Sequence, residues 1–388
     1  MKVICLTLST VVFVVVASFF SVNIWAEKEE HIAGEVELTL TSEMTIMRFG
    51  EENGLSRQLL GRVFSLNAPE QMQEPVTSFD MSLEQIKSKV DKEIALETED
   101  ASKNWLKIPL KFVLWFVFMA VCFKMLTQRK IKRTARLILY VLGFTLFGVI
   151  LGADPSPMGT VKDAIVLYAS KGVIYKPRVI AFTIFTLTVV FANKFICAWG
   201  CQLGTLQDFI FRLNRNKQDS GGGEYPQIKV PFVVSNSVRV LFAAALVWVA
   251  FTWTYDITHE IDPFKIFKPL TISHYGWMFI LVLLTSSIFV YRPWCHFFCP
   301  FGLTGWLFEK MSLLRIKVNY DTCISCEACV KACPSAVMGA ILKREKTVIP
   351  DCFSCGNCIE ACPTQAVTFS CGKREKPPEG KFCERKAG

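Results

Sequence analysis

Eight cysteines near the end of the chain stand in two runs that share one spacing. The runs read CISCEACVKACP, residues 323–334, and CFSCGNCIEACP, residues 352–363. Each follows C-x2-C-x2-C-x3-C-P, a ligand spacing of cubane iron–sulfur clusters. Where two such runs occur together, the fourth cysteine of each run ligates the cluster of the other run. The pattern therefore predicts two [4Fe–4S] clusters with crossed ligand sets.

The predicted sets combine three cysteines of one run with the last cysteine of the other. Cluster one takes Cys323, Cys326, Cys329 and Cys362, and cluster two takes Cys352, Cys355, Cys358 and Cys333. Structural zinc fits less well, because it usually takes widely separated C-x2-C pairs or cysteine with histidine, and no histidine follows His296. Disulfides suit a secreted domain, whereas the topology below places this one in the cytosol.

Four further cysteines form two C-x3-C pairs, in FICAWGCQLG and WCHFFCPFG. They are Cys197, Cys201, Cys295 and Cys299. Each pair is expected at the end of a membrane span, with its thiols one helical turn apart on the same face. Three interpretations remain open: ligation of a third iron–sulfur cluster, redox-active dithiols, or structural thiols.

The composition indicates a membrane protein. Of 388 residues, 52% are hydrophobic and 32 are phenylalanine, which is more apolar than an ordinary soluble domain. The formal net charge of +9 is compatible with nucleic-acid binding, but much of the basic charge borders apolar segments, where it sets membrane orientation. Membrane lipid is therefore an expected partner and nucleic acid is not.

Six apolar segments have about the length of a membrane helix. They are residues 3–22, 108–126, 136–152, 179–197, 237–255 and 276–292. The first is a signal peptide or a signal anchor, and its length favours the anchor. The last four are expected to form two hairpins of equal orientation, because each hairpin has an Asp-Pro in its outer loop and a C-x3-C pair at its end.

The basic loop QRKIKRTAR, residues 128–136, is predicted to be cytoplasmic. Counting crossings from it places residues 27–104 outside the cell and everything after Tyr291 inside. The expected location is the inner (plasma) membrane. Residues 215–229, RNKQDSGGGEYPQIK, are expected to form a flexible cytoplasmic linker because of their glycines.

Five regions follow from these observations. Residues 1–26 form the signal anchor or signal peptide, 27–104 an extracytoplasmic helical segment, 105–312 the transmembrane domain with both C-x3-C pairs, 313–370 the two-cluster domain and 371–388 a basic tail. In the extracytoplasmic segment, Ser56 and Ser82 are expected to cap helices. Three small helices there resemble a helix-turn-helix, but an outer location and the lack of basic charge favour a docking or spacer role over DNA binding.

Asp154, Glu260 and Asp262 lie in the outer loops and are candidate proton acceptors for a quinol, although such residues more often cap turns. Haem is not predicted, because no predicted span contains histidine and C-x-x-C-H is absent. No general acid, base or nucleophile stands out, so the chain is expected to move electrons without bond chemistry of its own.

The spans, the motifs CAWGCQ and CHFFCP and the two C-terminal runs together resemble the NapH/NosR-type membrane-bound polyferredoxins, over about residues 108–370. The resemblance implies an α-helical polytopic membrane protein with a C-terminal α+β ferredoxin-like domain. It also implies electron transfer between the quinone pool or a cytosolic donor and a redox partner such as a respiratory reductase, as in quinol oxidation. The chain lacks the large outer flavin domain of NosR, and it has a first span and an outer helical segment that the simplest NapH form lacks. The alternative function is a redox-sensing regulator or a maturation factor for a reductase.

The predicted topology can be tested with a reporter fused after Gly388. A cytosolic fluorescent reporter should be active there, because the positive-inside rule places the end of the chain in the cytosol. A fusion at residue 70 should instead activate a periplasmic phosphatase reporter. Phosphatase activity from the C-terminal fusion would refute the orientation.

Overall fold

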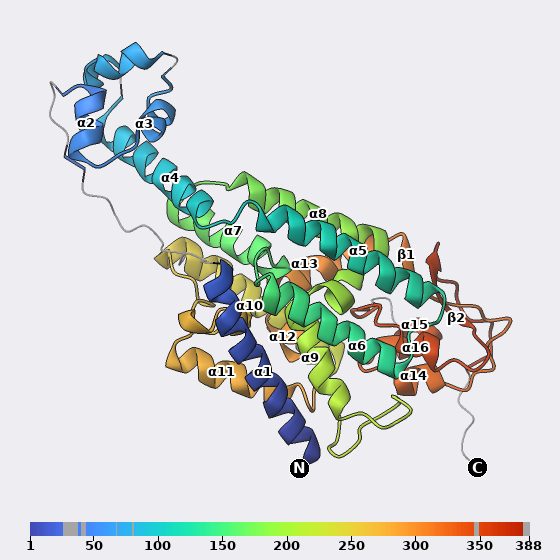
Figure 1. Cartoon of the computed structure of the whole chain (residues 1–388). Coiled ribbons are helices and arrows are strands. Elements are labelled where there is room, and N and C mark those ends of the chain that lie inside the picture. The colour runs from blue at the N-terminus through green and yellow to red at the C-terminus, as the bar shows by residue number, and fades with distance from the viewer. Residues whose placement is uncertain (26–37, 40–43, 67, 80, 345–348, 383–388) are drawn as a thin grey trace.

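The structure is a computed structural model that describes residues 1–25, 38–39, 44–66, 68–79, 81–344 and 349–382. It is mostly helical. A bundle of helices occupies the middle, a small helical unit lies at one end, and the cysteine-rich C-terminal region lies at the other end (Figure 1).

Four helical stretches in the described residues are long and apolar enough to cross a membrane. They are Lys2–Val22 in α1 (Lys2–Trp25), α5 (Lys107–Thr127), Arg133–Ile150, which joins α6 (Arg133–Phe144) to the π-helical turn η3 (Thr145–Ile150), and α10 (Phe232–Trp253). The other two predicted spans are shorter helices, α8 (Lys176–Ala192) and α11 (His274–Ser286). The segment 179–197 does not form one helix because α8 ends at Asn193, which has a φ of 58°.

The first helix packs as part of the bundle. α1 lies against η3 and against the 3-10 helix η5 (Pro263–Phe267). The Ser21 hydroxyl donates to the Ile150 carbonyl oxygen at 3.0 Å.

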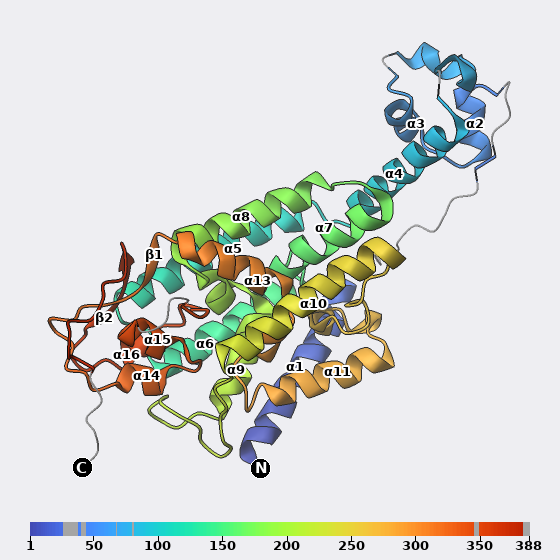
Figure 2. The same cartoon turned by 180° about the vertical axis from the view of Figure 1, so that it is seen from behind.

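The two C-x3-C segments follow the same order of elements. α8 leads through the π-helical turn η4 (Ile196–Gly200) into α9 (Gln202–Leu213). α11 leads through α12 (Pro293–Phe297) into α13 (Pro300–Phe308) and η7 (Glu309–Met311). Between the two copies, α7 (Pro157–Lys171) packs against α8, α10 and α13 (Figure 2).

The segment predicted to be extracytoplasmic contains α2 (Ile46–Glu52), α3 (Arg57–Val63), η1 (Pro69–Gln73), η2 (Val76–Phe79) and α4 (Leu83–Ala101). Of these, α2, α3, η2 and α4 share a separate apolar core. Both predicted caps are present: Ser56 accepts from the Leu59 N–H at 3.1 Å, and Ser82 caps α4. α4 is longer than expected and reaches the bundle, where its Glu99 pairs with Arg178 at 3.0 Å.

The C-terminal region is a small α+β unit. β1 (Leu314–Val318) pairs antiparallel with β2 (Val367–Cys371), with Leu314 opposite Cys371. Three short helices lie between the strands in sequence: α14 (Ala328–Ala332), α15 (Val337–Lys343) and α16 (Asn357–Glu360). The alternating burial of β1 follows its period-two pattern of apolar and basic residues.

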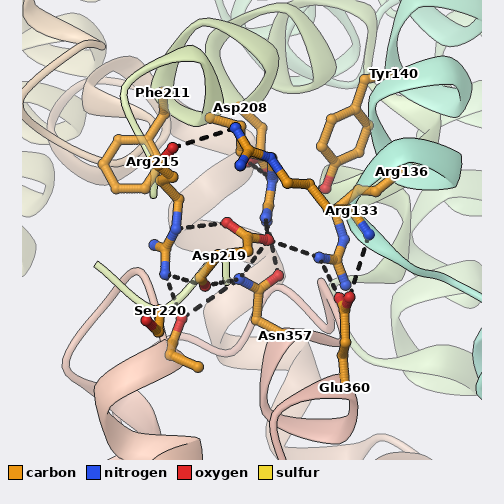
Figure 3. Close-up of polar contacts among 12 residues, drawn as sticks. Arg133, Arg136, Tyr140, Asp208, Phe211, Arg215, Asp219, Ser220, Asn357 and Glu360 are labelled. Atoms are coloured by element: carbon orange, nitrogen blue, oxygen red, sulfur yellow. Dashed lines mark hydrogen bonds and ion pairs between the residues drawn. The ribbon is translucent and has the colours of Figure 1, made fainter. Parts of the chain in front are cut away.

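A buried ionic cluster joins this unit to the helical bundle (Figure 3). The Asp219 carboxylate pairs with Arg136 at 2.9 Å, with Arg215 at 2.6 Å and with Arg212. Asn357 of α16 donates to the same carboxylate at 3.1 Å. Asp219 lies in the segment expected to be a flexible linker; that expectation was wrong, because the pairing with three guanidinium groups holds the loop in place.

The basic loop between α5 and α6 also contacts the C-terminal unit. Arg129 donates to the carbonyl oxygens of Val367 at 2.6 Å and Ile359 at 3.2 Å. Arg136 pairs with Glu360 at 2.9 Å. These arginines therefore anchor the cysteine-rich unit, a role that the positive-inside rule did not reveal.

We expect Asp219→Ala to destabilise the folded protein by about 3–5 kcal/mol, because it leaves buried guanidinium groups without their counter-charge. Thermal unfolding in detergent, followed by loss of cluster absorbance, would measure the change. Glu52→Ala is the control, since it removes an exposed i,i+4 pair with Arg48 that is worth at most about 1 kcal/mol. Equal melting temperatures for the two variants would show that the cluster does not stabilise the protein.

Candidate iron–sulfur centre

The four cysteines assigned from sequence to cluster two line one cavity. The cavity is small, and its wall includes Cys333, Cys352, Cys355 and Cys358. Cys333 comes from the first run and the other three from the second run. Their convergence on one cavity matches the crossed ligand pattern of a two-cluster domain.

The four cysteines assigned to cluster one also lie together. The thiol of Cys329, at the start of α14, is close enough to Cys323, Cys326 and Cys362 for their charges to act on it. α14 packs against α16, and this contact carries the fourth cysteine of the second run to the first run. Cys326 is exposed and Cys329 is buried, so this site lies at the surface, unlike the site for cluster two.

The two ligand loops turn in the same way. Ser325 and Ser354, which precede the second cysteine of each run, have φ values of 56° and 54°. The residues that follow this cysteine, Glu327 and Gly356, have φ values of 53° and 83°. Left-handed backbone at non-glycine residues is costly and marks functional sites. Here it curls each loop around a centre, which is the shape that a bound cubane needs.

The chemistry of the donors fits the same group. Burial raises the pKa of Cys329 to about 12, assisted by the nearby Cys362 and Cys323 thiols, and burial raises the pKa of Cys352 to about 12. Free thiols here therefore stay protonated at neutral pH, and iron must replace the protons as it binds. Among the described residues, no three ligand-type side chains lie close enough to hold a single metal ion. Each thiolate of a cubane binds a different iron, so a cubane does not require such close packing.

The C-x3-C cysteines occupy equivalent positions in their two segments. Cys197 lies in η4 and Cys201 is the N-cap of α9, whereas Cys295 lies in α12 and Cys299 is the N-cap of α13. All four are buried. The expectation of one continuous helical face was wrong, because Cys201 and Cys299 have extended backbone, with ψ values of 118° and 115°.

A glycine is required three residues after each helix-capping cysteine. A Cβ at Gly204 would lie 2.6 Å from the Cys197 carbonyl oxygen, and a Cβ at Gly302 would lie 2.9 Å from the Cys295 carbonyl oxygen. Both distances are too short for a side chain. The two copies therefore share the same tight return of the chain toward their first cysteine.

The four C-x3-C cysteines, termed the C-x3-C quartet below, lie close together inside the bundle. The thiol of Cys299 is near enough to Cys197, Cys201 and Cys295 for their charges to act on it. Trp115, in the middle of α5, donates to the Gly200 carbonyl oxygen at 2.9 Å. The quartet thus lies beside the middle of a membrane-length helix instead of at the end of a span, because the chain turns back after Asn193.

Three buried cations surround the quartet. Arg292 donates to the carbonyl oxygens of Cys197 and, at 3.0 Å, Ala198, while Arg239 donates to the Cys295 carbonyl oxygen at 3.4 Å. Lys194 donates to the Gly302 carbonyl oxygen at 3.0 Å. These positive charges favour the binding of an anionic group, and a cubane with four thiolate ligands is anionic.

Two carboxylates balance these cations. Asp351 pairs with Lys194 at 3.1 Å and with Arg239 at 2.5 Å, and Asp208 pairs with Arg292 at 2.6 Å. Sequence reasoning missed all five residues. A signal was available for two of them, because Lys194 and Arg292 both stand three residues before the first cysteine of a pair, and charge inside an apolar segment usually has a function.

A second cavity, of about 400 Å³, lies between the end of α4, the start of α7 and residues 256–271. The predicted proton acceptors stand at or near it. Asp262 caps η5 by accepting from the Phe264 N–H at 2.9 Å, which is the structural alternative stated above. Burial acts to raise the pKa of Asp154. The Lys268 ammonium, 2.7 Å from the Asp154 carboxylate oxygen, acts more strongly in the other direction, so the pKa of Asp154 is lowered. Hydrogen bonds from Ser273 and His259 lower the pKa of Glu260. Asp154 and Glu260 are therefore ionised at neutral pH but are weak bases.

Two protein-family models match the regions that hold these cysteines. A model described as a 4Fe-4S dicluster domain matches residues 315–363. A second, described as a 4Fe-4S binding domain, matches residues 177–219 and 274–319, and each of these stretches contains one C-x3-C pair. The chain carries iron–sulfur binding domains.

Curated proteins with similar sequences cover part of the chain. It is 28% identical over 179 residues to the "Putative electron transport protein YccM" of Escherichia coli (strain K12), a match of 44% of this chain and 48% of that protein. It is 25% identical over 161 residues to an uncharacterized protein, MJ0750, of Methanocaldococcus jannaschii, covering 40% of this chain and 63% of that protein. The chain therefore spans about half to two thirds of these relatives. No solved structure matches it.

The crossed ligand sets can be tested with single cysteine variants. Cys333 and Cys355 belong to different runs, but Cys333→Ala and Cys355→Ala should remove the same EPR signal. Each variant should also lose about four irons per chain, which is the content of one cubane. Cys362→Ala should remove the other signal. Cys371→Ala is the control, because this exposed thiol belongs to neither set and its loss should leave the iron content unchanged. Loss of different signals from Cys333→Ala and Cys355→Ala would refute the crossing.

Proposed function

We propose that this chain is a membrane-bound electron-transfer protein that passes single electrons through iron–sulfur clusters held at the end of its helical bundle. The observation that carries the proposal is the cavity lined by the cysteines of both runs, which is anchored to membrane-length helices by buried ion pairs. The description of the Escherichia coli relative as an electron transport protein agrees with it.

The quinone pool or a cytosolic donor is the proposed electron source, and a respiratory reductase or another redox protein the proposed acceptor. The NapH/NosR resemblance supports this route. The cavity near α4 and α7 opens beside Asp154 and His259 and could receive a quinol head group. Because Asp154 has a lowered pKa, it would not readily take up a proton that leaves the quinol.

The C-x3-C quartet is proposed to hold a third cluster. The match of a 4Fe-4S binding model to both C-x3-C stretches supports this interpretation. So do Lys194, Arg239 and Arg292 around the quartet, since an anionic cluster gains from buried positive charge. A dithiol pair would gain less, because buried protonated thiols are neutral.

Membrane vesicles that contain the protein provide the test of electron transfer. Addition of a reduced quinol analogue under anaerobic conditions should bleach the cluster absorbance at catalytic rates, and the Cys355→Ala variant should lose part of this change. A chain whose clusters are not reduced, but whose deletion abolishes maturation of a reductase, would instead be a maturation factor or a redox-sensing regulator.

A further inference from the structure

Two segments each place a large aromatic ring against the other segment. One is residues 352–358, termed the cluster-two loop, and the other is residues 197–201 of the first C-x3-C pair. Phe353 follows Cys352 in the cluster-two loop, and Trp199 stands between Cys197 and Cys201. Their exposed fractions are 3% and 0%. Both rings are therefore buried, and each comes from a segment that contains cysteine ligands of one predicted group.

Phe353 is enclosed by residues of both C-x3-C segments. Its ring centroid lies 5.2 Å from that of His296, at an interplanar angle of 74°, and 5.9 Å from that of Tyr291. The ammonium of Lys194 lies 4.6 Å from the same centroid, and the guanidinium of Arg292 lies 5.4 Å from it. The ring of the cluster-two loop is therefore in contact with the surroundings of the quartet.

Trp199 makes the reciprocal contact. Its indole N–H donates to the Ser354 carbonyl oxygen at 3.3 Å, and Ser354 directly precedes the ligand Cys355. The Trp199 ring centroid also lies 5.1 Å from that of Tyr140. A hydrogen bond and an aromatic contact thus fix the cluster-two loop against the C-x3-C segments.

We propose that Phe353 and Trp199 are positioning residues that couple cluster two to the C-x3-C quartet. The inference rests on the proposed function, because it requires the quartet to hold a redox-active group. Cluster two, whose loop makes both contacts, is then the direct exchange partner of the quartet. Cluster one, with its exposed Cys326, is the point of exchange with a soluble protein.

The coupling requires no chemistry from the rings themselves. With a cubane held by the quartet, one electron would pass to it from reduced cluster two, with no bond formed and no proton moved. Electron-transfer rates fall steeply with the width of the gap, so a buried ring that fills the gap raises the rate without changing the driving force. Removal of the ring should slow the transfer and leave the midpoint potential of cluster two in place.

Freeze-quench EPR after mixing the full-length protein with dithionite tests this inference. Spins are counted against time for the two clusters and for the quartet, and alkylation with mass spectrometry follows the quartet thiols in case they form a dithiol pair. Phe353→Leu should delay reduction of the quartet several-fold while clusters one and two are reduced at the normal rate. Trp199→Phe, which keeps a ring but loses the N–H, should cause a smaller delay.

Two variants serve as controls. Phe353→Tyr retains the ring and should restore the wild-type rate. Phe49→Leu removes a buried ring that packs on Phe64 in the separate apolar core of the N-terminal helical unit, and it should leave the rate unchanged. A redox titration of each variant would show whether the midpoint potential of cluster two has moved.

Three results would overturn the inference. A wild-type rate in Phe353→Leu, or a delay explained by a shifted midpoint potential, would show that the ring does not carry the coupling, while the proposed electron-transfer function would stand. A quartet in the wild-type protein that changes neither spin count nor alkylation would remove both the coupling and the third centre. Reduction of clusters one and two by quinol would remain a separate test of the protein's function.

Discussion

Pairing of buried charge is the constraint on which the arrangement of this protein depends. A guanidinium group cannot lose its proton, so each buried arginine needs a carboxylate or carbonyl partner. Asp219, Asp208 and Asp351 supply such partners, and each neutralises cations from segments that lie far apart in the sequence. Any displacement of the cysteine-rich unit along the bundle would separate these charges. The ion pairs therefore fix the position of this unit on the bundle.

This position orders the redox sites. The cavity for cluster two is buried against the bundle, beside Tyr291 and Phe353, whereas Cys326 of cluster one faces solvent. Gly356 illustrates how close the docking is: its φ is 83°, and a Cβ there would lie 2.3 Å from Leu126 of α5. The surface cysteines assigned to cluster one, the buried cysteines assigned to cluster two and the quartet therefore follow one another toward the middle of the bundle.

Much of the architecture followed from local patterns. The caps at Ser56 and Ser82 could be predicted because a hydroxyl that satisfies free N–H groups is a short-range interaction. The apolar runs 3–22 and 108–126 indicated helices of membrane length for the same local reason. The predictions failed where a distant contact outweighed the local signal. Glycines suggested a flexible linker, but Asp219 is held by three arginines; an apolar run suggested a long fourth span, but α8 ends at Asn193.

The spacing of the cysteines was enough to predict iron–sulfur chemistry and which thiols should share a cluster, because cubane ligation is dictated by short loops of constant length. The iron–sulfur domain models agree with the predicted chemistry. Only the tertiary structure could place the C-x3-C quartet deep in the bundle and surround it with Lys194, Arg239 and Arg292. It also brings Phe353 against Lys194 and Arg292, and Trp199 against Ser354. These contacts join residues separated by up to about 160 positions, as between Lys194 and Phe353, and no local periodicity encodes which of many buried charges and rings will meet.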